Sequence, residues 1–174
     1  MSTLTSSRPE PSEHAPYYGK YIALVPENDA IAALENQITD ALVVLRTIPE
    51  AKGSHRYAPG KWTIKEVLGH LADGERVFSY RALRFGRTDQ TELPGFDENI
   101  YVPAGNFNDR PLAVLIDDWQ IVRASTISLF RGFDSAAWTR DGIANDDRMS
   151  VRALAYVIAG HGRHHMEILR SRYL

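Results

Sequence analysis

Histidines are the residues of this chain best suited to chemistry. The sequence holds six histidines and no cysteine. A thiolate nucleophile, a disulfide and a cysteine-ligated metal are therefore excluded, and a metal ion would bind through nitrogen and oxygen. His161 and His165 are four residues apart in a segment whose apolar pattern predicts a helix, so both imidazoles lie on one face. That spacing suits two ligands of one ion.

A third histidine, His70, lies in an earlier predicted helix on the face shared with Val67 and Asp73. Facing helices of a bundle commonly direct metal ligands inward. Three imidazoles leave a coordination position open, as is typical of catalytic zinc. Judged by the pattern alone, a surface pair or buried structural histidines explain the spacing equally well. Gly162 follows His161 where an HExxH zinc protease has its glutamate, so that general base is missing.

Two charged residues are predicted to take part in catalysis. Asp73 lies one turn beyond His70 and is expected to orient that imidazole or to accept a proton; the alternative is a solvated carboxylate. Arg123 lies beside the apolar stripe of a later helix. It is expected to bind a carboxylate of a substrate or thiol cofactor, although a packed stem with its charged head in water is the commoner outcome.

The elements that must position these residues are predicted to be four long helices. Apolar residues recur at helical spacing over 28–48, 63–85, 109–130 and 151–172. Thr63 and Glu66 form a capping-box pattern at the second start, and Ser150 is the expected N-cap of the last helix. Since no convincing strand is found, the predicted fold is an all-α four-helix bundle with long connecting loops at 87–108 and 134–149.

Composition limits the remaining classes of protein. Residues 1–16 are expected to form a disordered tail because they lack periodicity and are rich in Ser, Thr, Pro and Glu, which leaves one domain over 17–174. The formal net charge is −2, which argues against a nucleic-acid partner. No apolar run approaches the ~18 residues of a membrane span. The first residues lack the pattern of a secretory signal, so the expected location is cytoplasmic.

Two motifs in a fixed order resemble those of a known family. The first is PGKWTIKE at 59–66, which leads into GHLADGE at 69–75, and the second is AGHGRHH at 159–165. Their order and separation make the chain, from about residue 30 to 174, similar to the DinB-like superfamily, which includes the YfiT-like metal-dependent hydrolases. The resemblance implies an up-down-down-up four-helix bundle. It also implies one divalent ion, zinc or nickel, on His70, His161 and His165.

The resemblance also implies a range of activities. Some relatives transfer low-molecular-weight thiols, and some isomerise maleylpyruvate with a thiol cofactor. We therefore expect a metal-dependent enzyme, a hydrolase or a thiol S-transferase, that activates water or a low-molecular-weight thiol against a small-molecule substrate. A homodimer is expected because relatives commonly pair. Two alternatives stay open: a non-catalytic bundle with a structural ion, and a metal-free interaction domain with buried histidines.

Overall fold

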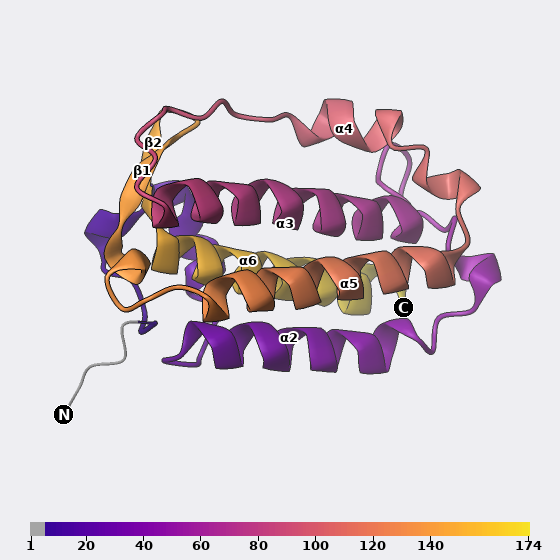
Figure 1. The fold of residues 1–174 in the computed structure, drawn as a ribbon. Helices are drawn as coiled ribbons and strands as arrows, with labels where there is room; N and C mark the ends of the chain where they lie inside the picture. The colour runs from indigo at the N-terminus through magenta and orange to yellow at the C-terminus, as the bar shows by residue number, and fades with distance from the viewer. Residues whose placement is uncertain (1–5) are drawn as a thin grey trace.

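The computed structural model describes residues 6–174, which are mostly helical (Figure 1). The helices are α1 (Gly19–Ile22), α2 (Ala30–Leu45), α3 (Ile64–Gly86), α4 (Glu98–Ala104), α5 (Leu112–Arg131) and α6 (Val151–Ile168), and a π-helical turn (Leu169–Tyr173) continues α6. Short 3-10 turns occupy Pro11–Glu13, Pro16–Tyr18, Glu50–Lys52, Phe107–Asp109 and Ala137–Thr139. Within this part of the chain, no helix combines the length and the apolar character needed to cross a bilayer.

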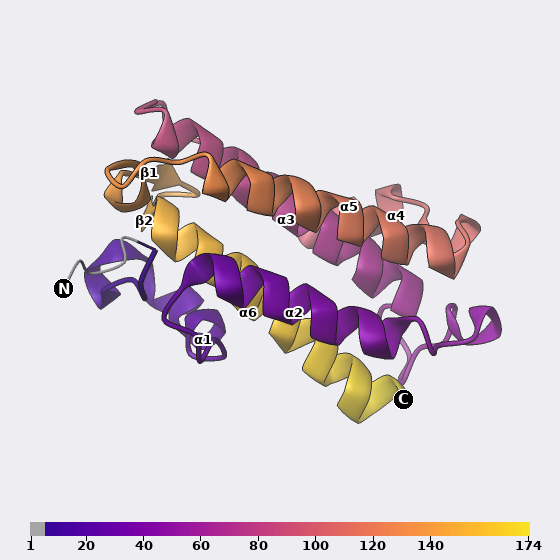
Figure 2. The same cartoon turned by 60° about the horizontal axis from the view of Figure 1, so that its bottom comes forward.

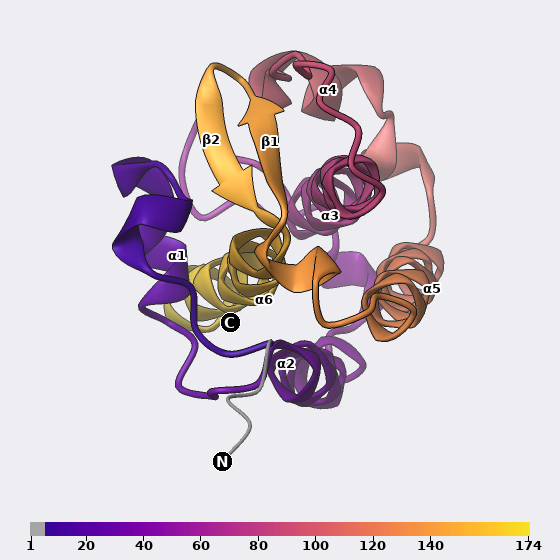
Figure 3. The same cartoon turned by 60° about the vertical axis from the view of Figure 1, so that its left-hand side comes forward.

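The helices α2, α3, α5 and α6 lie side by side and are called here the helical bundle (Figure 2). Helices α2 and α3 each pack against both α5 and α6, which closes a ring of four that is seen nearly end-on in Figure 3. Helices α2 and α6 run in one direction, and α3 and α5 run in the opposite direction (Figure 1). Because α3 and α5 are parallel, the segment between them must travel the length of the bundle, and it carries α4 across the outside of α3.

Capping residues set the starts of the long helices where the sequence predicted them. The Thr63 hydroxyl accepts a hydrogen bond from the Glu66 amide at 3.0 Å, and the Glu66 carboxylate accepts one from the Thr63 amide at 2.7 Å. Ser150 caps α6 by accepting from the Ala153 amide at 3.1 Å. These starts matter because α3 and α6 carry the three candidate histidines.

A small antiparallel hairpin replaces part of the loop expected at 134–149. Strands β1 (Asp141–Ala144) and β2 (Asp147–Ser150) pair directly, so the expectation of no strand is wrong here. Asn145 and Asp146 both have positive φ, 55° and 64°, which matches the tight turns that join such strands. Leu93, which lies in the crossover segment between α3 and α5, forms two hydrogen bonds with the hairpin. Its amide donates to the Ile143 carbonyl and its carbonyl accepts from the Asn145 amide, each at 3.0 Å. Four-residue strands are too short to show an alternating pattern in the sequence.

The N-terminal segment is folded over a longer stretch than the predicted tail allows. Residues 1–5 of that tail lie outside the described part of the chain. From Ser6 onward the segment packs on the bundle: the Ser6 carbonyl accepts from the Ala30 amide at 3.0 Å, and Glu13 pairs with Arg152 of α6 at 2.8 Å. These partners are distant in the sequence, so composition alone could not indicate them.

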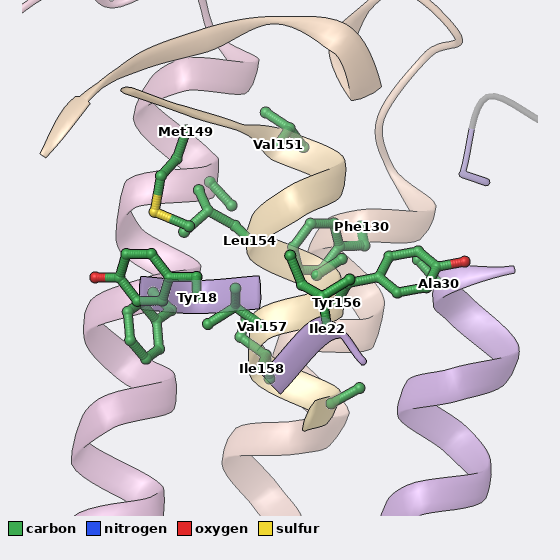
Figure 4. Close-up of a cluster of buried hydrophobic side chains, with 14 of the residues drawn as sticks. Tyr18, Ile22, Ala30, Phe130, Met149, Val151, Leu154, Tyr156, Val157 and Ile158 are labelled. Carbon is green, nitrogen blue, oxygen red and sulfur yellow. The ribbon is translucent and has the colours of Figure 1, made fainter. Parts of the chain in front are cut away.

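Buried apolar residues form two clusters, one toward each end of the bundle. Figure 4 shows the cluster nearer the hairpin, where Ile22 of α1 lies against Val157 and Ile158 of α6. On each long helix a buried polar residue lies between members of one cluster and members of the other; α5 has a second one, Thr126, and one residue from each helix makes a group of four. We call these four residues the polar layer: Gln37, Glu75, Arg123 and His161.

Candidate metal centre

Three histidines meet where α3 and α6 pack together. His70 comes from α3, and His161 and His165 come from α6; one nitrogen from each lies within 4.8 Å of the others. The Nε2 atoms of His70 and His161 are 3.0 Å apart. Two metal–nitrogen bonds of about 2.0–2.1 Å to one ion are compatible with that separation. The donor set therefore fits a single ion that prefers imidazole ligands.

Glycines beside the histidines allow the neighbouring elements to come close. A Cβ atom on Gly160 would lie 2.0 Å from the Tyr21 carbonyl oxygen, so α1 approaches α6 only because that side chain is missing. A Cβ on Gly162 would meet the Gln37 side chain of α2 at 2.7 Å. In the sequence Gly160-His161-Gly162, the two glycines thus place His161 between a close contact with α1 and a close contact with α2.

Aromatic rings surround the three imidazoles. Trp62 lies tilted over His70, with ring centres 4.8 Å apart, and Tyr21 meets His161 edge-on at 5.5 Å. The Phe78 ring is also edge-on to His161, with ring centres 6.1 Å apart. These rings restrict the access of water to the imidazoles and hold their orientation.

Burial keeps the histidines neutral near pH 7. It lowers the pKa of His70 to about 4. It also lowers the pKa of His161 and of His165 well below the usual value, helped by the charges of neighbouring groups, among them Arg123 for His161. A neutral imidazole has the free lone pair that a metal requires, so these side chains are ready to bind an ion without first losing a proton.

A cavity of about 390 Å³ opens onto the three histidines. Its other walls are mostly aromatic, with three charged groups and two further polar side chains: Tyr17, Tyr18, Tyr21, Trp62, Phe78 and Phe96, then Arg81, Glu98 and Asp147, then Asn145 and His164. Burial raises the pKa of Tyr18 and of Tyr21, so both phenols stay protonated and are hydrogen-bond donors at neutral pH. Sequence reasoning gave the tyrosines no role. The run Tyr-Tyr-Gly-Lys-Tyr at 17–21 was the available signal.

Asp73, predicted to be catalytic, lies on α3 but does not line the cavity. It is half-buried, and its carboxylate accepts a hydrogen bond from Arg76 at 3.3 Å. Burial raises the pKa of Asp73, and the Arg76 charge opposes that rise. Arg76 also binds Asp118 of α5 at 2.6 Å, so this side chain belongs to a contact between α3 and α5.

Arg123, the other residue with a predicted catalytic role, is only 1% exposed and lies in the polar layer. Its Nε and Nη2 donate to the two carboxylate oxygens of Glu75 at 2.7 and 3.0 Å. Its Nη1 donates to the Leu34 carbonyl at 2.9 Å and to the Gln37 side chain at 2.5 Å. It does not reach the cavity, and Glu75, its partner, had no predicted role.

Comparison with known proteins identifies the family. The model of the DinB superfamily matches residues 33–169. The chain belongs to the DinB superfamily. This is the family that the two sequence motifs resemble, so that prediction is confirmed.

Two solved structures are similar to this fold. YfiT from Bacillus subtilis, described as a probable metal-dependent hydrolase with an unusual four-helix bundle topology, matches with a TM-score of 0.67 and 17% identity. That match covers 95% of this chain and 96% of YfiT. A mycothiol-dependent maleylpyruvate isomerase matches with a TM-score of 0.66 and 11% identity, over 79% of this chain and 58% of the isomerase. At these identities the likeness shows the fold alone.

Proposed function

We propose that this DinB-superfamily protein is a metal-dependent enzyme with one divalent ion, zinc or nickel, on His70, His161 and His165. It acts on a small molecule, as a hydrolase with water or as an S-transferase with a low-molecular-weight thiol. The observation that carries the proposal is the convergence of three neutral imidazoles on one wall of an aromatic cavity. The description of YfiT as a probable metal-dependent hydrolase supports the first activity, and the mycothiol dependence of the isomerase supports the second.

The chemistry divides between the ion and the chain. A divalent ion with an open position lowers the pKa of water or a thiol and polarises an acceptor. The chain supplies the three ligands, the rings of Trp62 and Tyr21 that hold them in place, and a cavity wall that restricts water. The protonated phenols of Tyr18 and Tyr21 donate hydrogen bonds to oxygen atoms of the substrate. Arg123 acts from the polar layer as a positioning residue, because its charge helps keep His161 neutral.

Elemental analysis of the purified protein tests the metal site. We expect one ion per chain in the wild type, and loss of most of it in His161→Ala and His165→Ala. His164→Ala is the matched control: it changes the neighbouring histidine of the same helix, which lies outside the group of three. A wild-type protein without metal after expression in metal-rich medium contradicts the proposal, as does equal metal content in all three variants.

Removal of the ion separates a catalytic role from a structural one. For an enzyme, chelation abolishes thiol conjugation to a model electrophile, or hydrolysis of a model ester, and added metal restores it. The alternative is a structural ion, which is favoured by the origin of the ligands on two helices, α3 and α6. It predicts a large fall in melting temperature on chelation and no turnover to lose. Turnover that is unchanged after complete chelation contradicts the enzyme proposal.

Two further proposals concern the bundle topology and the assembly state. We propose that the fold is the four-helix bundle named for YfiT, on the basis of the ring of four long helices. We also propose a homodimer. Val43 on α2 and Ile121 on α5 support it, since these two apolar side chains on neighbouring helices are 70% and 67% exposed. Light scattering during size-exclusion chromatography measures the mass directly, and a monomer at all concentrations overturns the dimer.

A further inference from the structure

Arg81 is a buried cation without a carboxylate partner. Its side chain is only 2% exposed and lines the cavity; Nη2 donates a hydrogen bond to the Pro94 carbonyl at 3.1 Å, and the guanidinium also lies within hydrogen-bonding reach of the Tyr18 phenol. Within residues 6–174, no carboxylate lies within ion-pair distance of it. A guanidinium has five N–H donors, and a buried charge is costly unless it is paired. By contrast, Arg123 is equally buried and has its full set of partners.

Arg81 and the histidines lie toward opposite ends of one cavity. His70 and Arg81 are about three turns apart on α3, which places them on the same face and about 16 Å apart along the helix axis. The Phe78 ring lies between the two ends. Its centre is 5.7 Å from the guanidinium carbon of Arg81 and 6.1 Å from the centre of the His161 ring. The centre of the Phe96 ring is 6.3 Å from the centre of the Phe78 ring and 6.0 Å from the guanidinium carbon of Arg81.

We propose that Arg81 binds a carboxylate of the substrate or thiol. The ligand then has a carboxylate at one end, an apolar middle against Phe78 and Phe96, and its reacting group at the three histidines. An arginine suits this task because its planar fork matches the two oxygens of a carboxylate. The inference rests on the proposed function, since it assigns the substrate class of the same site. It makes Arg81 the residue that selects acids over neutral molecules.

Two carboxylates in the cavity bear on this assignment. Glu98 acts at the histidine end, where its charge opposes the fall in the pKa of His70 that burial causes. Asp147 of β2 acts near Arg81, since both charges influence the phenol of Tyr18, whose pKa is raised chiefly by burial. Asp147 is not within ion-pair distance of Arg81, so it competes with a ligand carboxylate through charge without occupying the guanidinium.

A pair of thiols that differ only at the far end tests the proposal on cobalt-loaded protein. Mercaptohexanoate and mercaptohexanol both place a thiolate on the metal, which gives a charge-transfer absorption band, but only the first offers a carboxylate. We expect the acid to bind roughly tenfold to a hundredfold more tightly than the alcohol, as one charged hydrogen-bonded pair would produce. Mercaptoacetate is too short to reach beyond Phe78, so its affinity should not depend on Arg81. Equal affinity for acid and alcohol in the wild type overturns the proposal, and that comparison needs no variant.

Two variants place the effect on Arg81. Arg81→Gln should abolish the preference for mercaptohexanoate and leave mercaptoacetate unchanged. Asp147→Asn, the matched control on the same wall, should keep the preference or increase it, because it removes a competing negative charge. A preference that survives in Arg81→Gln, or that disappears in Asp147→Asn, overturns the assignment.

Calorimetry on the metal-free protein separates this inference from the proposed function. Hexanoate and hexanol have no thiol and need no ion, and hexanoate should still bind more tightly in the wild type but not in Arg81→Gln. If cobalt fails to bind while this preference persists, the metal proposal fails and the Arg81 site stands. If cobalt binds and neither pair of ligands shows a preference, the reverse holds.

Discussion

At the scale of single residues, the candidate metal centre depends on what lies next to each imidazole. Burial makes the histidines neutral, and the missing side chain at Gly160 lets the Tyr21 backbone approach α6. Tyr21 in turn places its ring edge-on to His161 and to His164, at 5.5 and 5.4 Å. Gly160, which has no side chain to take part in chemistry, therefore controls the surroundings of His161, a candidate metal ligand.

Substitution of Gly160 by alanine tests this dependence. The added Cβ would lie 2.0 Å from a backbone oxygen, so α1 must move away, and we expect a loss of about 1–3 kcal/mol in the free energy of unfolding. The expected displacement of Tyr21 should also weaken metal binding. Gly19→Ala is the control: Gly19 has helical φ and ψ, and its Cβ would make only a 3.7 Å contact. Denaturant unfolding of both variants measures the difference, and equal stability of Gly160→Ala and wild type contradicts this account.

At the residue scale, spacing predicted part of the site and missed the rest. The convergence of His161 and His165 follows from helical geometry, which is local. Glu75 was missed because its role depends on Arg123 of another helix, 48 residues away, and on the direction in which α3 and α5 pack. Arg123 was placed beside the correct stripe, but the same stripe faces the polar layer instead of the cavity.

At the scale of elements, the hydrogen bonds of the polar layer join α2, α3 and α5 at mid-height. Glu75 accepts from Arg123 and also from the Trp119 indole at 3.0 Å, and Arg123 reaches Gln37 on α2. A buried ion pair adds little net stability over apolar packing, but removal of one partner leaves an uncompensated charge. The layer therefore favours one alignment of α2, α3 and α5, and α6 packs against α2 and α3 in that alignment with His161 beside His70.

A double-mutant cycle on this pair measures the coupling. Glu75→Leu and Arg123→Met should each lower the free energy of unfolding by about 3–5 kcal/mol, and the double variant should lose much less than the sum. The exposed pair Arg46 and Asp117, 2.9 Å apart across α2 and α5, is the control cycle. Its coupling should be within about 1 kcal/mol. Additive losses at the buried pair contradict the proposed interdependence.

Elements with strong local signals were predicted well, and elements held by distant partners were not. The capping box at Thr63 and the N-cap at Ser150 are formed by residues close in the sequence, so they predicted the starts of α3 and α6 correctly. The hairpin was missed because its strands are short and its third partner, Leu93, comes from the crossover. α4 was expected to be part of a loop, since seven residues with Pro103 inside give little helical periodicity.

At the scale of the whole molecule, the N-terminal segment completes the cavity. Tyr17, Tyr18 and Tyr21 form one wall, and ion pairs fasten the flanking chain to α6. On one side Glu13 binds Arg152, and on the other Glu27 binds Arg163. The cavity therefore stays intact only while the segment before α2 is attached to α6. Detachment of this segment should disturb ligand binding before the helical bundle unfolds.

The pair of Glu27 and Arg163 makes this attachment sensitive to acid. Two hydrogen bonds of 2.7 and 2.9 Å from Arg163 lower the pKa of Glu27 to about 2, from 4.5 for the free side chain. Because the folded state holds the carboxylate charged, the pair stabilises the fold fully above pH 4.5, and the contribution disappears as the pH falls from 4.5 toward 2. Glu27→Gln should therefore be less stable than wild type at neutral pH, and the difference should shrink over that window.

Denaturant unfolding at a series of pH values tests the attachment. Glu167→Gln, an exposed α6 position that forms no ion pair in the described chain, is the control and should track the wild type throughout. Protease cleavage before α2 should report the same window, because release of this segment exposes it while the four long helices still pack. A constant difference between Glu27→Gln and wild type from neutral pH to pH 3 contradicts the role of this pair, since a charge-dependent contact must weaken as its carboxylate becomes protonated.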